Sequence, residues 1–199
     1  LIYLIEFVLG LSAADWQLRA LQENLPTAEE LNLPAPVPPP FFLIVGFAIT
    51  ILLGVIFYPL FVLPLEIGWR GFFTGRLLED GRLYAYGLTG IVSGVWLLPL
   101  ILAPPFQQFV DVTAPARTVL FAIIAAFVLG EILRRTGNVS LCAIALASWA
   151  SHATGIAVYA FPGAVAPWAG PTGFVSAVVW GLVAFLLFRR PSPDRGTSV

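Results

Sequence analysis

The chain has 199 residues, of which 59% are hydrophobic and only 11% charged, so it is a poor candidate for an ordinary water-soluble domain. Its formal net charge is −1, with ten arginines and no lysine, which excludes the basic surface that a nucleic acid needs in a partner. The lone cysteine, Cys142, excludes a disulfide framework or a cluster of thiolate metal ligands within one chain. A protein folded within a lipid bilayer is the class that remains.

Six apolar stretches are expected to cross the membrane as α-helices, because about 20 apolar residues span roughly 30 Å of hydrocarbon. We place these spans at residues 1–14, 41–65, 84–103, 117–133, 138–160 and 172–188. The first is short and contains Glu6, and a few residues before Leu1 would complete it. The fold class is therefore an all-α, polytopic transmembrane helix bundle that forms a single domain over residues 1–199.

Residues 15–40 connect the first two spans and combine an amphipathic stretch with a proline-rich run. This pattern predicts a helix at the membrane interface followed by an extended connector. Arginines in short loops are retained on the cytoplasmic side. Eight of the ten arginines lie on one side of the six-span arrangement: Arg70, Arg76, Arg82, Arg134, Arg135, Arg189, Arg190 and Arg195. We therefore expect both termini in the cytoplasm and residues 15–40 on the opposite side.

Three stretches carry a resemblance to a known family. Residues 65–72 read LEIGWRGF, residues 93–100 read SGVWLLPL, and the pair Thr136 and Gly137 precedes the fifth span. Read together, they resemble the motifs of the CAAX prenyl protease and bacteriocin-processing family (CPBP, Abi-type) of intramembrane proteases. The resemblance covers about residues 41–160 and implies a membrane-embedded site for peptide hydrolysis in a bacterial plasma membrane.

The family's motif residues are only partly present in this chain. Of the two adjacent glutamates that open the first motif, the first is replaced by Leu65, whereas Glu66 and the arginine Arg70 remain. Leu97 stands where the second motif has a histidine. Leu146 and Ala150 stand where the last motif has a histidine and an asparagine. In the family these groups are thought to activate a water and to stabilise the oxyanion. Leucine and alanine can do neither.

Glu66 and Arg70 lie four residues apart and can form an ion pair on one face of a helix. One interpretation is a residual site for water or substrate. The other is a buried pair that holds the second span against its neighbours. We favour the second, because a carboxylate neutralised by its arginine is a poor base.

His152 is the only histidine, and it raises the question of whether it replaces the missing one. At about 100° per residue, six residues place it roughly 120° around the helix from Leu146 and ~9 Å further along. We therefore expect it to face a different neighbour. It can hydrogen-bond between helices beside Ser151 and Thr154. Alternatively, it can serve as the single axial ligand of a metal, a haem or a chlorophyll-type pigment.

Small residues recur at every fourth position of the fifth span, which allows another helix to approach closely. They are Ala143, Ala147, Ser151 and Gly155, and Gly90 and Gly94 form a matching notch on the third span. Internal packing of the bundle is the simplest use of both features.

Three hypotheses for function follow. The first is a pseudo-protease that serves as a membrane-embedded binding or scaffold subunit, with membrane lipid and another membrane protein or a larger membrane complex as partners. The second is an active CAAX-type intramembrane endopeptidase with a variant site built from Glu66 and His152. The third is an accessory subunit of a larger membrane complex that binds a pigment at His152. We expect no nucleic acid as a partner. We also expect no metal other than one ligated by His152, as in the third hypothesis.

Overall fold

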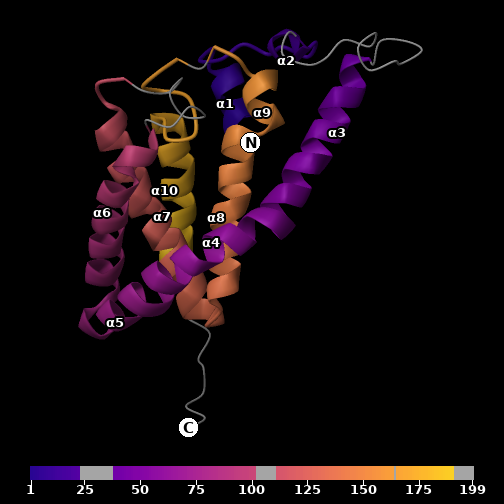
Figure 1. Cartoon of the computed structure of the whole chain (residues 1–199). Coiled ribbons are helices and arrows are strands. Elements are labelled where there is room, and N and C mark those ends of the chain that lie inside the picture. Colours follow the sequence, from indigo (N-terminus) through magenta and orange to yellow (C-terminus); the bar gives the residue numbers. More distant parts are fainter. Residues whose placement is uncertain (23–37, 102–110, 164, 191–199) are drawn as a thin grey trace.

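The computed structural model describes residues 1–22, 38–101, 111–163 and 165–190, and every regular element in these ranges is a helix (Figure 1). Three of the described helices are long and apolar enough to cross a membrane: Pro40–Asp80, Ala114–Thr136 and Val139–Ala160. A shorter apolar helix covers Phe174–Arg189. The predicted all-α transmembrane bundle is therefore confirmed.

The amino-terminal helix α1 covers Ile2–Val8 and is shorter than the predicted first span. The chain turns after it at Gly10, whose positive φ of 71° is a conformation that glycine adopts without steric cost. Glu6 is fully buried, and its Oε1 accepts a hydrogen bond of 3.0 Å from the backbone N–H of Gly170. The short helix α2, Arg19–Gln22, lies within the connector for which an interfacial helix was predicted, and residues 23–37 of that connector lie outside the described residues.

The second span is part of one continuous helix of 41 residues, Pro40–Asp80, that extends well beyond the predicted end at residue 65. It consists of α3 (Pro39–Leu52), the π-helical segment η1 (Leu53–Phe57), α4 (Tyr58–Glu66), the π-helical segment η2 (Ile67–Thr74), α5 (Gly75–Leu77) and the 3₁₀ turn η3 (Leu78–Asp80). The predicted span ended at residue 65, immediately before the charged residues Glu66 and Arg70. Both side chains are buried, so the helix continues through them.

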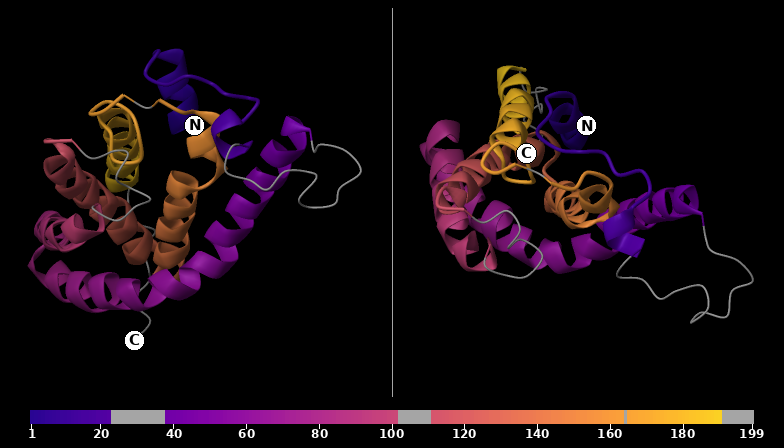
Figure 2. Two further views of the ribbon diagram at one scale, coloured as in Figure 1. Left: turned by 45° about the horizontal axis from the view of Figure 1, so that its top comes forward. Right: turned by 90° about the horizontal axis from the view of Figure 1, so that it is seen from above.

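Two prolines lie between the π-helical segments of this helix. Pro59 and Pro64 each lack the N–H of an α-helical hydrogen bond, which explains a change of hydrogen-bond register on either side of them. The helix runs obliquely to the other helices in Figure 1 and follows one side of the bundle in both views of Figure 2.

Helices α6 (Arg82–Ile101) and α7 (Ala114–Thr136) form a closely packed antiparallel pair. A Cβ atom at Gly90 would lie 2.4 Å from the Cα of Ile123, and one at Gly94 would lie 2.9 Å from the Cα of Val119. The two glycines therefore let the backbone of α7 approach. The notch thus serves packing within the bundle, as expected, and the helix that enters it is α7 rather than the fifth span.

The predicted fifth span is divided into α8 (Val139–Thr154) and α9 (Ile156–Ala160), with a break at Gly155. Its small-residue face packs against the oblique helix: Ser151 Oγ donates a hydrogen bond of 2.5 Å to the carbonyl of Thr50. A Cβ at Gly54 would lie 2.9 Å from Ser151 Cβ, so the contact depends on small residues on both helices. The last helix, α10 (Phe174–Arg189), packs against α7.

Candidate functional site

A cavity of about 120 Å³ lies between the oblique helix, α6, α7 and α8. Its wall residues are Leu65, Trp69, Arg70, Ser93, Trp96, Leu97, Thr118, Phe121, Ala122, Ala125, Leu146, Trp149 and Thr172. Leu65, Leu97 and Leu146 come from three different helices and stand at three replaced motif positions. The fold thus brings these positions together around one cavity, although they lie up to 81 residues apart in the chain.

The wall of the cavity offers little for acid–base chemistry. The three leucine side chains can neither accept nor donate a proton, and Glu66 is not among the wall residues. Hydroxyl groups come from Ser93, Thr118 and Thr172. Ser93 Oγ already donates to the carbonyl of Gly90 at 3.3 Å. No described residue of the wall can therefore act as a general base for a water molecule at neutral pH.

Arg70 brings a charge to the wall of this otherwise apolar cavity. Its Nη1 donates to Glu66 Oε1 at 3.1 Å, and the side chains of the arginine and the glutamate are 5% and 0% exposed. The pair lies where α4 passes into the π-helical segment η2, a type of helix that often occurs at functional sites. Within the described structure, Glu66 Oε2 and Arg70 Nε have no hydrogen-bond partner. These two buried atoms can therefore still form a hydrogen bond with a polar group of a water or a ligand.

Aromatic rings form much of the remaining wall. Trp69 and Trp96 meet edge to face at a centroid distance of 6.0 Å, and Phe121 and Trp149 stack at 4.6 Å. Trp96 is 53% and Leu65 40% exposed, so part of the wall of the cavity also reaches the surface of the bundle. A pocket with this lining suits a hydrophobic group.

Two of the residues singled out in the sequence lie away from the cavity wall. Ala150 is half-buried on α8, and its carbonyl accepts a hydrogen bond from Thr154 Oγ1 at 3.0 Å. His152 is exposed, and its Nδ1 lies 2.7 Å from the carbonyl oxygen of Ser148 in the same helix. The structure thus places this histidine contact within α8 rather than between helices, and neither His152 nor Glu66 lines the cavity.

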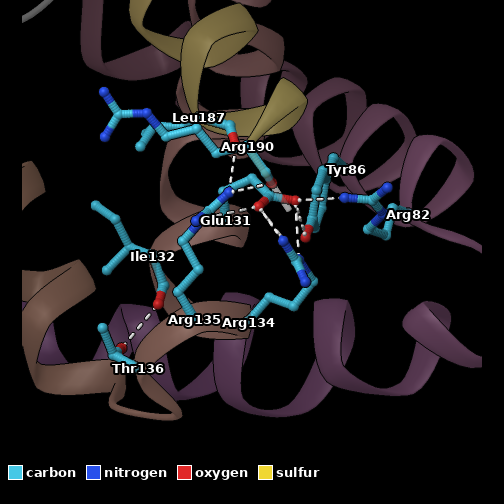
Figure 3. A network of polar contacts seen from close by, with 9 residues as sticks. All are labelled: Arg82, Tyr86, Glu131, Ile132, Arg134, Arg135, Thr136, Leu187 and Arg190. Carbon is cyan, nitrogen blue, oxygen red and sulfur yellow. Dashed lines mark hydrogen bonds and ion pairs between the residues drawn. The ribbon is translucent and has the colours of Figure 1, made fainter. Parts of the chain in front are cut away.

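A second cluster of charges was missed by the sequence analysis (Figure 3). Glu131 of α7 is fully buried and forms ion pairs with Arg134 at 2.7 Å, with Arg135 at 3.2 Å and with Arg82 of α6 at 3.2 Å. Tyr86 also donates its hydroxyl hydrogen to Glu131 Oε1 at 3.3 Å. The i,i+3 and i,i+4 spacing of Glu131 to the two arginines of α7 was the available signal. The contribution of Arg82 depends on tertiary packing.

The described residues contain no group of three or more His, Cys, Asp or Glu side chains arranged to hold a metal ion. Searches of curated proteins and of solved structures found no match to the chain. The family model described as type II CAAX prenyl endopeptidase Rce1-like matches residues 44–151, which is more than half of the chain. It covers the helices that form the cavity, and the resemblance inferred from the three motifs is confirmed. The chain therefore belongs to the Rce1-like family of membrane proteins.

Proposed function

We propose that this chain is a non-hydrolytic member of the Rce1-like family that uses the membrane cavity to bind a hydrophobic group, as a binding or scaffold subunit of a membrane assembly. The observation that carries the proposal is the meeting of Leu65, Leu97 and Leu146 at one cavity. In the family's motifs these positions hold a glutamate and two histidines. With leucine side chains at all three positions, the chain keeps a pocket but lacks these proton-transfer groups.

The size of the chemical loss supports this reading. A positioned general base contributes a factor of about 10²–10⁴ to a hydrolytic rate, and one oxyanion donor contributes about 10²–10³. The carboxylate that remains, Glu66, does not line the cavity and is held by Arg70 at 3.1 Å. Binding in the cavity requires only an aromatic and aliphatic wall, which this chain has.

Peptidase activity is the direct test. The purified chain and the variant that combines Leu65→Glu, Leu97→His, Leu146→His and Ala150→Asn would be assayed side by side on prenylated and unmodified peptides. We expect the unaltered chain to release no product above the peptide-only background. Cleavage by the unaltered chain, with loss in Glu66→Gln, would overturn the proposal in favour of an active endopeptidase.

Binding is tested separately with an alkyl diazirine lipid probe incorporated in nanodiscs. Photolysis followed by peptide mapping is expected to place adducts on cavity residues such as Trp96 and Trp149. Ala125→Phe adds a ring to the wall and should reduce these adducts, whereas Val178→Phe, on the exposed face of α10, should not. Adducts spread evenly over the lipid-facing helices would contradict a binding role for the cavity.

A second candidate function, pigment binding by an accessory subunit, is favoured by the geometry of His152. Because its Nδ1 faces the carbonyl oxygen of Ser148 at 2.7 Å, the proton belongs on that nitrogen. This leaves the lone pair of Nε2 on an exposed ring, as axial ligation of a metal in a pigment or haem requires. The absorption spectrum of the protein purified from its native membrane, compared with that of His152→Ala, tests this candidate. An absorption band that persists in the variant would exclude His152 as the ligand.

A further inference from the structure

The cluster around Glu131 lies where three membrane helices reach the same end of the bundle. Arg82 begins α6, Arg134 and Arg135 belong to the last turn of α7, and the carboxyl end of α10 lies beside them (Figure 3). Arg135 Nη2 donates to the carbonyl oxygens of Leu187 at 2.5 Å and Arg190 at 2.7 Å. Helix ends of this kind are at the depth of the lipid headgroups.

The cluster carries more positive charge than its own carboxylate can neutralise. One glutamate faces three arginines, and the side chains of Arg134 and Arg135 are each only 19% exposed. The adjoining residues 76–82 and 189–190 add Arg76, Arg189 and Arg190 against Glu79 and Asp80. Among the residues that the structure describes, this end of the bundle therefore has six arginines and three acidic residues. One carboxylate shared by three partly buried arginines leaves a net positive charge, which a further anion would balance.

Arg82 is the arginine best placed to bind such an anion. Its guanidinium makes a single ion pair, of 3.2 Å, and its side chain is 41% exposed. The guanidinium lies over the ring of Phe188 at 4.4 Å from the centroid, which holds it at the apolar boundary. Within the described part of the chain, its remaining N–H groups form no hydrogen bond that would compete. Arg134, in contrast, directs Nε and Nη2 towards Glu131.

We propose that the phosphate of an anionic membrane phospholipid binds at Arg82, with its acyl chains along α6 and α10. A phosphate accepts hydrogen bonds from guanidinium groups at short distance and in a fixed geometry. A lipid with a net negative charge balances the excess positive charge of the cluster. A zwitterionic lipid carries its own positive group and therefore does not balance this charge. This site is separate from the cavity and does not depend on the proposed function.

Thermal unfolding of the delipidated protein in detergent, followed by tryptophan fluorescence, tests the proposal. Phosphatidylglycerol is expected to raise the midpoint temperature in a saturable way, whereas phosphatidylcholine and inorganic phosphate are not. Since a direct hydrogen bond between charged groups contributes about 1.5 kcal/mol or more, Arg82→Gln should require about tenfold more phosphatidylglycerol for half of the effect. Arg76→Gln removes an exposed arginine at the same end and should leave the curve unchanged.

Arg82→Lys, which keeps the charge, is expected to give an intermediate curve. Should Arg82→Gln not fold, retention of phosphatidylglycerol over phosphatidylcholine by the unaltered protein in native mass spectrometry still decides the preference. The proposal is overturned if the two lipids raise the midpoint temperature equally or if inorganic phosphate alone raises it. It is also overturned if Arg82→Gln and Arg76→Gln weaken the response to phosphatidylglycerol equally. The last result would indicate general surface attraction rather than a site.

Discussion

At the scale of single residues, the ion pair of Glu66 and Arg70 is the part of the family's first motif that the chain retains. Both side chains are buried and belong to the same helix, so the pair neutralises charge without linking two helices. Taking two charges out of water costs free energy that their attraction offsets only in part. The pair is therefore expected to stabilise the fold mainly by each partner compensating for the other.

A double-mutant cycle tests this view of the pair. Glu66→Met and Arg70→Met should each lower the free energy of unfolding by about 3–5 kcal/mol, because each leaves one buried charge unpaired. The combined variant should be more stable than either single variant. Unfolding in detergent would be compared for the four proteins. Additive losses would show that the pair does not act as a unit.

Asp111 precedes α7 outside the membrane spans and gives a pH-dependent prediction. The hydroxyl and the backbone N–H of Thr113 each donate to its Oδ1 at 2.6 Å, and Arg117 Nη2 donates to Oδ2 at 2.9 Å. The hydroxyl of Thr113 first, and then the other donors, hold the pKa of Asp111 below its usual value. The ionised Asp111 therefore stabilises the folded protein fully when the pH is above the usual aspartate pKa of about 3.9. This stabilisation is lost as the pH falls through the lowered pKa of the folded state.

Asp111→Asn should accordingly lower the midpoint of thermal unfolding at pH 7, and the difference from the unaltered protein should shrink in strong acid. Asp80→Asn, at an exposed position, serves as the control and should have little effect at either pH. A difference between Asp111→Asn and the unaltered protein that stays constant from pH 7 to acid would contradict the assignment.

At the scale of helices, close contacts depend on glycines at particular positions rather than on glycine content. Gly90 faces the backbone of α7, whereas Gly87, one turn earlier on the same helix, has no atom within 4 Å of the position of a Cβ. The sequence showed that Gly90 and Gly94 form a notch. It could not show which helix enters that notch, because this depends on the packing of the whole bundle.

Gly90→Ala should therefore destabilise the protein by about 1–3 kcal/mol, since α6 and α7 must move apart to admit the methyl group. Gly87→Ala should leave stability unchanged or raise it, because alanine favours the helix. Denaturation midpoints of the two variants in the same detergent are the measurement. Equal midpoints would mean that the contact of α6 with α7 is looser than described.

The carboxylate of Glu131 holds α6 and α7 together through Arg82, and Arg135 extends the contact to α10. Glu131→Gln would remove the carboxylate that pairs with three arginines. Because these arginines are partly exposed, we expect the free energy of unfolding to fall by about 3 kcal/mol, near the lower end of the range for a broken buried ion pair. Glu79→Gln removes an exposed carboxylate at the same end of the bundle and should change stability little. A loss of similar size in both variants would assign the effect to net charge alone.

At the scale of the whole molecule, the six apolar stretches and the family were evident from the sequence, because hydropathy and motif spacing are local properties. The meeting of Leu65, Leu97 and Leu146 at one cavity followed from the family resemblance rather than from pattern. The continuation of the second helix to Asp80 was missed, because the span was delimited by its uncharged apolar residues and the charged Glu66 and Arg70 follow them. The break at Gly155 was missed because the uncharged tract continues across it.

The orientation of the bundle stays a prediction, and the chain allows a simple test of it. Its one native cysteine, Cys142, is fully buried and should not react with a maleimide in the folded protein. A membrane-impermeant maleimide added to intact cells should label Trp16→Cys and should label Arg190→Cys only after permeabilisation. The reverse pattern would place the arginine-rich end outside.

The exposure of the wall residues Leu65 and Trp96 has a consequence for the proposed binding role. A hydrophobic molecule that binds there would arrive by lateral diffusion within the hydrocarbon, so the relevant concentration would be its mole fraction in the bilayer. Acyl chains of the surrounding lipids are present in large excess and compete for the same space. Dilution of the aqueous phase would then leave occupancy unchanged, whereas dilution with added lipid would empty the cavity.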